Sequence, residues 1–383
     1  MWKRGITLLE RNQKSEFQAI GKQKILENRI AYCLLAGGQG TRLNCSGPKG
    51  FFKPDLPLDR SLFQIHAERL LGFGTTPEWF LLTSYATDEE TRDYFKNHNN
   101  FGYPNEKLHF VVQDSLPCLN IQKEPITLNS QPIQNPNGSG GVISALYHDH
   151  WIQYLIYLNI DYLILYNIDN LLVSIPDPTF VGWLTTELPD VAAKAIQKKY
   201  PDEAVGVFAQ NEEGKPIVYE YTDTPRDKIA EYTMGNAGIY AFSTQFLQQI
   251  GPMGIQSLPL HYSWKKISHD GDTNPKIPNA WKTETFIFDW FLNTTNFAWY
   301  EIDREEEFAP IKNANFCLND SPATAKQLWN QKWIKKLRNC GAQISNIIEI
   351  DISGEAEHWT NGRMIQWIQI FKPNIQTKQI ILQ

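Results

Sequence analysis

The 383-residue sequence contains no long hydrophobic run. Its longest apolar stretches, such as residues 162–166, have the length of a core strand, and a membrane-spanning helix needs ~20 residues. The N-terminus begins with cationic residues at Lys3 and Arg4 but lacks the apolar segment of a secretion signal. These absences predict a cytoplasmic protein with no membrane partner.

Cysteine is scarce, and its spacing differs from that of a disulfide framework or a zinc site. There is no C-x-x-C pair, and an odd number at scattered positions is typical of free thiols in a reducing compartment. The five cysteines are Cys33, Cys45, Cys118, Cys317 and Cys340.

The sequence also lacks a long basic block. Its 36 Lys and Arg residues are set against 42 Asp and Glu residues, so the composition argues against a nucleic-acid partner. The chain is long enough to bury a large core, and we expect one large catalytic domain with smaller additions.

Strand and helix patterns alternate along the first half of the chain. Strands are expected at residues 30–36, 79–83, 108–113 and 162–168. Helices are expected to begin after Ser61 and after Thr87, each capped by that residue with a Gln or Glu three positions on. A third helix is expected from the glycine loop 137–141 to about residue 159. This alternation predicts an α/β fold with a mostly parallel, Rossmann-like central sheet and flanking helices. Functional residues should lie just beyond the carboxyl ends of the strands.

The second half of the chain is mixed in pattern. Strands are expected at 191–196, 204–209, 217–221 and 238–242, and helices at 243–250, 284–292 and 320–338. We divide the chain into a helical lead-in of residues 1–29, a catalytic domain of residues 30–340 and a small β-rich region of residues 341–383. In the last region, the alternating runs at 344–352 and 364–371 are the expected strands.

One loop carries the clearest functional signal. The buried strand at 30–36 leads into Gly37, Gly38 and Gly40, and the cations Arg42 and Lys49 follow. Glycines let a backbone approach an anion closely and offer N–H donors, and the two cations add charge where a polyphosphate could bind. The pattern predicts a nucleotide site.

Two better-known phosphate-binding motifs are excluded at this loop. A dinucleotide fingerprint requires a third glycine where this chain has Leu43. A Walker A loop requires Gly-Lys-Ser/Thr, whereas here Lys49 follows Pro48 and precedes Gly50.

The loop belongs to a longer series of motifs. These are Leu-Ala-Gly-Gly-Gln-Gly-Thr-Arg-Leu at 35–43, Pro-Lys-Gly at 48–50, Asn-Gly-Ser-Gly-Gly at 137–141, Asn-Ile-Asp-Asn at 167–170, Gly-Asn-Ala-Gly at 235–238, Phe-Ile-Phe-Asp at 286–289 and Phe-Ala-Pro-Ile-Lys-Asn-Ala at 308–314. With this series, the sequence resembles the eukaryotic-type UDP-N-acetylhexosamine pyrophosphorylases. They are the UDP-N-acetylglucosamine-forming branch of the UTP:sugar-1-phosphate uridylyltransferases. The matches occur in order from about residue 30 to about residue 325.

The resemblance implies a nucleotidyltransferase reaction. A sugar-1-phosphate oxygen attacks the α-phosphorus of UTP, and pyrophosphate leaves. The nucleophile is already an anion, so catalysis depends on positioning and on cations rather than on a base. By match to the family, Arg42 and Lys49 contact the UTP phosphates and Lys312 contacts the sugar-linked phosphate. Asp169 is the expected ligand of Mg²⁺, a metal that proteins commonly hold with one or two carboxylates plus phosphates and water.

The resemblance also assigns the residues that bind the base. Uracil presents a donor at N3 flanked by carbonyl acceptors, and an amide side chain can pair with that edge. Gln113 supplies this amide, and the backbone around Ala36, Gly37, Gly38 and Gly140 supplies further contacts.

The sugar pocket is assigned in the same way. Glu220 accepts hydrogen bonds from sugar hydroxyls, Asn236 lies near the N-acetyl group, and Gly206 offers close backbone.

Some questions stay open in the sequence. Both ends differ from the family, which leaves open the choice between N-acetylglucosamine, N-acetylgalactosamine and glucose, and also whether the chain is a monomer or a weak homo-oligomer. The alternatives are a UDP-glucose or UDP-sugar pyrophosphorylase of the same family and a non-catalytic UDP-sugar-binding protein. A glycosyltransferase would normally show Asp-x-Asp, and Asn167 stands at the first position of that pattern.

Overall fold

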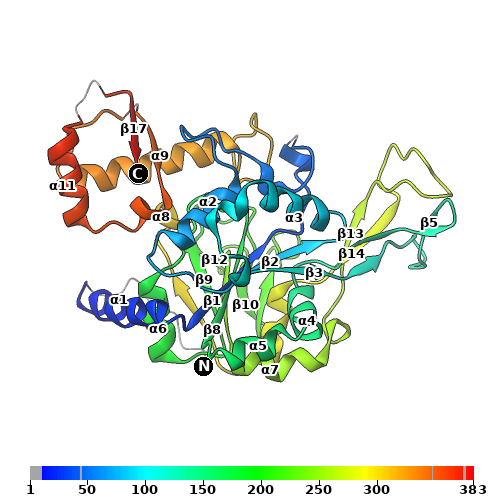
Figure 1. The fold of residues 1–383 in the computed structure, drawn as a ribbon. Helices are drawn as coiled ribbons and strands as arrows, with labels where there is room; N and C mark the ends of the chain where they lie inside the picture. The colour runs from blue at the N-terminus through cyan, green and yellow to red at the C-terminus, as the bar shows by residue number, and fades with distance from the viewer. Residues whose placement is uncertain (1–10, 44, 347, 374–376) are drawn as a thin grey trace.

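The computed structural model describes residues 11–43, 45–346, 348–373 and 377–383. Strand β1 (Ile30–Leu35) lies inside a sheet that helices cover on both faces (Figure 1). Its side chains alternate between two cores because successive residues of a strand point to opposite faces. Tyr32 and Leu34 pack in the core with α2 (Leu62–Leu71) and α6 (Pro178–Glu187). Ala31 and Cys33 pack in the core with α4 (Gly141–His148) and α7 (Thr244–Ile250).

The central sheet has nine strands, and β12 and β11 run opposite to the other seven. The order is β3–β2–β1–β8–β12, followed by β9 and β15, with the β10–β11 hairpin also paired to β12. The strands besides β1 are β2 (Trp79–Ser84), β3 (Leu108–Gln113), β8 (Tyr162–Asn167), β9 (Val191–Gln197), β10 (Val207–Gln210), β11 (Pro216–Tyr219), β12 (Met234–Ser243) and β15 (Phe297–Glu301). The predicted α/β fold with a mostly parallel sheet and flanking helices is confirmed.

Strand β12 creates the edge on which the site is built. Its residues 239–243 pair antiparallel with β8, and its first residues, beginning at Met234, extend past the end of β8. Gly235 in this extension pairs with Val207, which holds the β10–β11 hairpin beside it. The carboxyl ends of β1, β3 and β8 and the N-terminal end of β12 therefore share one edge of the sheet.

A two-stranded arm projects from the body (Figure 1). It contains the antiparallel hairpin β13 (His261–Lys265) and β14 (Ala280–Glu284), joined to the segment after β3 by a bridge between Leu119 and Trp281. The short strands of that segment are β4 (Ser115–Pro117), β5 (Thr127–Leu128), β6 (Gln131–Pro132) and β7 (Gln134–Pro136).

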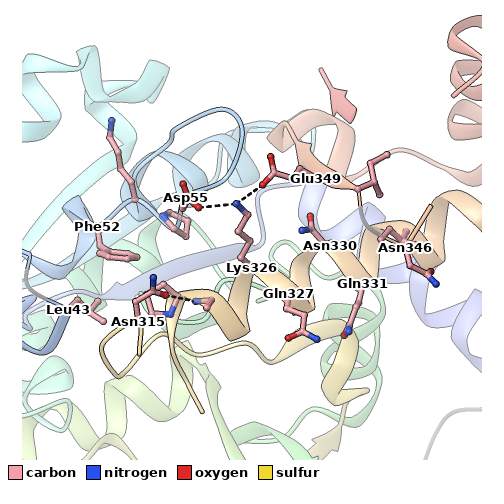
Figure 2. Close-up of a pocket in the computed structure, with 16 residues that line it drawn as sticks. Leu43, Phe52, Asp55, Asn315, Lys326, Gln327, Asn330, Gln331, Asn346 and Glu349 are labelled. Carbon is pink, nitrogen blue, oxygen red and sulfur yellow. Dashed lines mark hydrogen bonds and ion pairs between the residues drawn. The ribbon is translucent and has the colours of Figure 1, made fainter. Parts of the chain in front are cut away.

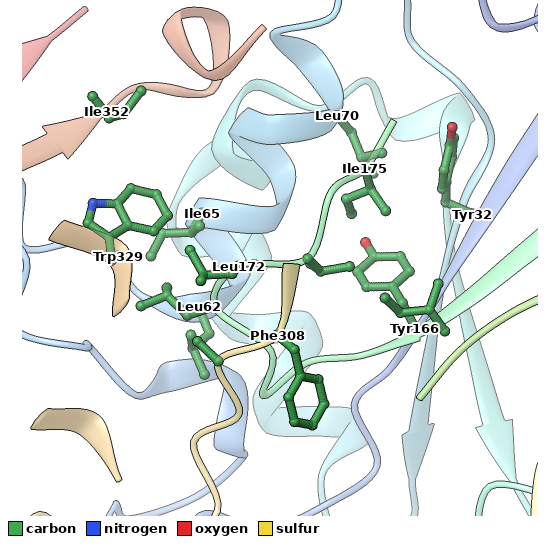
Figure 3. Packing of buried hydrophobic residues seen from close by; sticks show 14 of the residues in the cluster. Tyr32, Leu62, Ile65, Leu70, Tyr166, Leu172, Ile175, Phe308, Trp329 and Ile352 are labelled. Atoms are coloured by element: carbon green, nitrogen blue, oxygen red, sulfur yellow. The ribbon is translucent and has the colours of Figure 1, made fainter. Parts of the chain in front are cut away.

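The chain begins and ends with elements that pack on the central domain. Helix α1 (Arg11–Leu26), the described part of the predicted lead-in, lies along α6, and residues 1–10 of that lead-in are outside the described residues (Figure 1). Near the other end, Trp329 of α9 (Pro322–Asn339) and Ile352 share a core with Leu62 and Ile65 of α2 (Figure 3). The described residues of the C-terminal region thus pack into the same core as α2.

The region after residue 341 is mixed, and the expectation of a β-rich tail is wrong for residues 364–371. It contains the parallel strands β16 (Glu349–Ile352) and β17 (Gln379–Leu382), and also the helices α10 (Gly354–Glu357) and α11 (Asn361–Phe371). Thr360 caps α11 by accepting from Arg363 N, 3.3 Å away. Met364, Trp367 and Ile368 are three and four positions apart, which places them on one helix face, and all three pack in the core shared with α2.

Two helix predictions also need correction. The single helix expected from the glycine loop to about residue 159 is two helices, α4 and α5 (Trp151–Tyr157), because His150 adopts a left-handed conformation with φ of 62°. Thr87 precedes α3 (Asp88–Asn97), but its hydroxyl accepts from Ser84 N at 3.0 Å and does not cap the helix.

The cysteines, the search for membrane-spanning helices and two short helices complete the description. The five cysteines are all in described parts of the chain and form no disulfide. No helix in the described ranges combines the length and apolar character needed to cross a bilayer. The helix expected at 284–292 is the 3₁₀ helix Ile287–Asn293, and helix α8 is Arg304–Glu307.

Candidate active site

The carboxyl ends of the parallel strands open onto a cleft with two connected halves. The glycine-loop half has a volume of about 660 Å³ and lies between the loop after β1, the end of β3 and the end of β14. The β12 half, of about 370 Å³, lies between the end of β8, the first part of β12 and the segment 308–313. Arg42, Ser139 and Asn167 line both halves, so one elongated ligand can extend through both.

Most of the predicted site residues line this cleft, although they are far apart in the sequence. Those in the glycine-loop half are Gly37, Gly38, Arg42 and Gln113. Those in the β12 half are Arg42, Asp169, Gly206, Glu220, Asn236 and Lys312.

Three predicted residues, Ala36, Gly140 and Lys49, do not line the cleft surface, and Lys49 reaches it through its contact with the lining residue Asp169. Ala36 is fully buried at the end of β1. Gly140 donates its N–H to the Thr285 carbonyl oxygen at 3.1 Å, and its own carbonyl accepts from Trp290 Nε1 at 2.9 Å. These backbone groups of Gly140 are engaged within the protein, and residues 138–139 form the cleft surface in its place.

Gln113 and Gly37 are packed against each other in the glycine-loop half. A β-carbon on residue 37 would lie 2.2 Å from Gln113 Nε2, so any residue larger than glycine would displace the Gln113 amide. With its amide oriented to satisfy its neighbours, Asn137 donates to Gln113 Oε1 at 3.2 Å. Gln113 is 5% exposed, and Nε2 is the donor that it retains for a ligand.

Lys49 and Asp169 form the charged centre of the cleft. Lys49 Nζ lies 2.9 Å from Asp169 Oδ2, and both side chains are mostly buried. Burial by itself raises the pKa of Asp169, but the charges of Lys49 and Lys312, the Lys49 hydrogen bond and Arg42 outweigh it and lower the pKa. Asp169 is therefore an anion at neutral pH, surrounded by the three predicted catalytic cations.

Asn170 joins the Asp169 segment to the Lys312 segment, a role that sequence reasoning missed. Its Nδ2 donates to the Glu307 carbonyl oxygen at 2.8 Å, and its Oδ1 accepts from Ala309 N at 2.9 Å. Oδ1 also accepts from Leu172 N at 3.2 Å, and Asn170 is only 2% exposed. The position of Asn170 beside Asp169 in one motif was the available signal.

A second set of bonds fixes the backbone next to Lys312. Ile311 N donates to the Asp169 carbonyl oxygen at 2.9 Å, and Lys312 N donates to the Asp320 carbonyl oxygen at 2.7 Å. The lysine and the carboxylate are thus held on adjoining, hydrogen-bonded backbone.

The three residues predicted for the sugar lie together in the β12 half. Asn236 N donates to the Gly206 carbonyl oxygen at 2.7 Å, and a β-carbon on Gly206 would lie 3.4 Å from Glu220 Oε1. Asn236 Nδ2 donates to the Tyr240 hydroxyl at 2.8 Å. Burial raises the pKa of Glu220, and the charge of Lys312 opposes this rise.

The cleft contains further residues that sequence reasoning did not single out. Phe286 and Phe288 form a wall of the β12 half, and Lys282 and Glu284 of β14 line the glycine-loop half. The Phe-Ile-Phe-Asp motif was visible in the sequence. The sequence did not show that β14 lines the cleft. The long connection between β13 and β14 hides from a local pattern that the two strands form a hairpin.

A second cavity, of about 690 Å³, lies between the segment after Lys49 and helix α9 (Figure 2). Its central cation, Lys326, lies 2.9 Å from Asp55 Oδ2 and 2.8 Å from Glu349 Oε1, so its charge is already paired. None of the predicted site residues lines it. A polyanionic ligand fits the cleft better than this cavity.

Comparison with known proteins agrees with this geometry. Residues 2–324 match the model of the UTP--glucose-1-phosphate uridylyltransferase family. The chain is 35% identical over 349 residues to the Arabidopsis thaliana UDP-N-acetylglucosamine diphosphorylase 2, covering 83% of this chain and 68% of that one. It is 34% identical over 369 residues to a Dictyostelium discoideum protein named as a probable UDP-N-acetylglucosamine pyrophosphorylase, covering 88% of this chain and 76% of that one.

A solved structure extends the likeness to three dimensions. A protein of Entamoeba histolytica, provisionally named as a UDP-N-acetylglucosamine pyrophosphorylase, superposes with a TM-score of 0.85 at 28% identity. The superposition covers 96% of each chain. The chain therefore belongs to the UTP--glucose-1-phosphate uridylyltransferase family, and within it is similar to members named as UDP-N-acetylglucosamine pyrophosphorylases.

Proposed function

We propose that the protein joins UTP and N-acetylglucosamine-1-phosphate to form UDP-N-acetylglucosamine and pyrophosphate. One observation carries the proposal: the cleft brings Arg42, Lys49, Lys312 and Asp169 together between a pocket with a buried amide and a pocket with Glu220 and Asn236. The relatives at 34% and 35% identity carry names for this reaction.

The chemistry follows from the charges. Both substrates are polyanions, and cations that are held in place stabilise the transition state because charge moves toward the departing pyrophosphate. Arg42 and Lys49 would contact the UTP phosphates, and Lys312 the sugar-linked phosphate. The two connected halves align the substrates end to end, so that the sugar-phosphate oxygen approaches the α-phosphorus opposite the leaving group.

Asp169 is a suitable ligand for Mg²⁺. No group of three or more His, Cys, Asp or Glu side chains forms a metal cage in the described parts of the chain. A magnesium ion that takes most of its ligands from phosphates and water needs no such cage, and the lowered pKa of Asp169 keeps its carboxylate ionised. Bound there, Mg²⁺ would neutralise phosphate charge.

The selectivity for the sugar rests on the β12 half. Glu220 is an acceptor for hydroxyls. The Asn236 amide donates one N–H to the Tyr240 hydroxyl and accepts from Gly238 N, and its second N–H and its second lone pair can serve an N-acetyl group. Phe286 and Phe288 give this half an apolar wall against which an acetyl methyl group can pack.

The test is pyrophosphate release from UTP and Mg²⁺ with a panel of sugar-1-phosphates. N-acetylglucosamine-1-phosphate should react fastest, with N-acetylgalactosamine-1-phosphate and glucose-1-phosphate slower. Faster turnover of glucose-1-phosphate would refute the N-acetylhexosamine assignment. If UTP binds but no sugar-1-phosphate of the panel releases pyrophosphate, the protein is instead a non-catalytic binding protein.

We also propose that the protein acts in the cytoplasm as a monomer or a weak homo-oligomer. The five unpaired cysteines support a reducing compartment. Light scattering during gel filtration over a range of protein concentrations measures the assembly. A concentration-independent dimer would contradict the proposal.

A further inference from the structure

Glu284 is an unexpected side chain for a pocket that receives a triphosphate. Among the described residues, it is the one carboxylate that lines the glycine-loop half. An ionised carboxylate can only accept hydrogen bonds, and it repels phosphate. A ligand group that meets this carboxylate favourably is therefore a hydrogen-bond donor.

The backbone places Glu284 near the middle of the cleft. Gly138 has φ of +85°, and a β-carbon there would lie 3.1 Å from Glu284 Cβ, so β14 packs directly on the 137–141 loop. The next residue, Ser139, lines both halves of the cleft. Glu284 thus lies beside the loop that leads from the glycine-loop half to the charged centre.

Lys282 holds the carboxylate in position. Its Nζ lies 3.1 Å from Glu284 Oε2, and the Glu284 side chain is 20% exposed. The lysine offsets the negative charge that Glu284 would otherwise present to the triphosphate. The other oxygen of the carboxylate can then face the ligand.

The order of groups along UTP identifies the donor. The base belongs at Gln113, and the phosphates belong at Arg42, Lys49 and Asp169, as proposed above. The ribose lies between base and phosphates, and its 2′- and 3′-hydroxyls are the hydrogen-bond donors of the nucleotide that lie nearest the phosphates. We propose that Glu284 accepts a hydrogen bond from the ribose 2′-hydroxyl, and so selects ribonucleotides against 2′-deoxyribonucleotides. This inference rests on the proposed function for the location of UTP.

The experiment compares UTP with 2′-deoxy-UTP in the wild-type protein and in Glu284→Ala. The wild type should prefer UTP by ~10- to 100-fold in kcat/KM, the range expected for one hydrogen bond to a charged group. In Glu284→Ala the ratio should fall close to one, chiefly through slower use of UTP. Because both nucleotides are assayed on the same sample, a loss of folded protein cancels in the ratio.

Two further variants sharpen the result. Glu284→Gln keeps an acceptor and should retain part of the preference. Glu349→Ala removes a strand carboxylate far from the cleft and should keep the wild-type ratio. A wild-type ratio in Glu284→Ala would overturn the inference.

Calorimetric binding separates this inference from the reaction itself. Suppose that no sugar phosphate reacts, but that UTP binds better than 2′-deoxy-UTP to the wild type and not to Glu284→Ala. The ribose contact then stands and the proposed reaction fails. If UTP reacts or binds and the preference survives in Glu284→Ala, the ribose contact fails and the reaction stands. If UTP does not bind at all, both fail.

Discussion

Replacing Asn170 by alanine tests how the cleft holds its charged groups in place. The substitution removes the hydrogen bonds to Glu307 O, Ala309 N and Leu172 N, and leaves those backbone groups without their side-chain partner. Each such bond contributes about 1 kcal/mol net, and a buried group left unpaired costs about 1–3 kcal/mol. We expect the free energy of unfolding to fall by about 3–5 kcal/mol.

The catalytic effect should exceed what the loss of stability explains. Asp169 and Lys312 are held on segments that Asn170 joins, and a misplacement of about 1 Å in a catalytic group can cost ~100-fold. We therefore expect kcat of the folded variant to fall by ~100-fold. Half-saturation by Mg²⁺ should shift to higher concentration. Both are measured by pyrophosphate release, after circular dichroism confirms folding.

Matched variants separate positioning from simple destabilisation. Asn170→Asp keeps the acceptor oxygens but loses the donor to Glu307 O, so an intermediate kcat is expected. Asn330→Ala removes an amide that accepts from Ile350 N at 3.0 Å, far from the cleft, and should lower stability while keeping kcat. If folded Asn170→Ala has the wild-type kcat and Mg²⁺ dependence, Asn170 is only a structural residue.

Three further outcomes are expected. Lys49→Ala should lower kcat by ~100-fold or more, the scale for removing a fixed charge that stabilises the transition state, and near-normal pyrophosphate release would refute its role. Gln113→Ala should weaken the preference for UTP over CTP in the same assay, and an unchanged preference would exclude the proposed base contact. Burial and the charge of Arg69 lower the pKa of His66 to about 3, so the unfolded chain takes up a proton below pH ~6.5 while the native state does not. Stability should consequently fall by about 2–3 kcal/mol from pH 6.5 to 4.5, and urea unfolding of His66→Gln should give a flatter curve; an identical pH dependence would contradict this assignment.

Local patterns were sufficient for the main elements of the fold. The buried runs that predicted β1, β2, β3 and β8 lie within a residue or two of the observed strands, because a strand buried on both faces needs a continuous apolar run. The Ser61 cap is also a local signal, and its hydroxyl accepts from Gln64 N at 3.2 Å. The error at residues 364–371 arose where a short apolar run fits both a helical and a strand period.

For the site, too, local motifs indicated the residue types, whereas contacts between distant residues became known only from the structure. The residue types in the glycine loop, in Asn-Ile-Asp-Asn and in Gly-Asn-Ala-Gly were enough to indicate a nucleotide-sugar site, and their individual roles remain predictions. The Lys49–Asp169 contact joins residues 120 positions apart, and the Asn170–Glu307 bond joins residues 137 apart. No local pattern encodes such distances.

By itself, the sequence determined the family, the alternation that makes a mostly parallel sheet, and the charged and amide residues available for the reaction. The tertiary structure alone decided that β12 extends past β8, that β14 brings Glu284 over the cleft, and that Asn170 fastens the Lys312 segment to Asp169. The physical reason is that apolar periodicity and capping act between near neighbours. The cleft, in contrast, depends on hydrogen bonds and packing between segments that meet only when the sheet has formed.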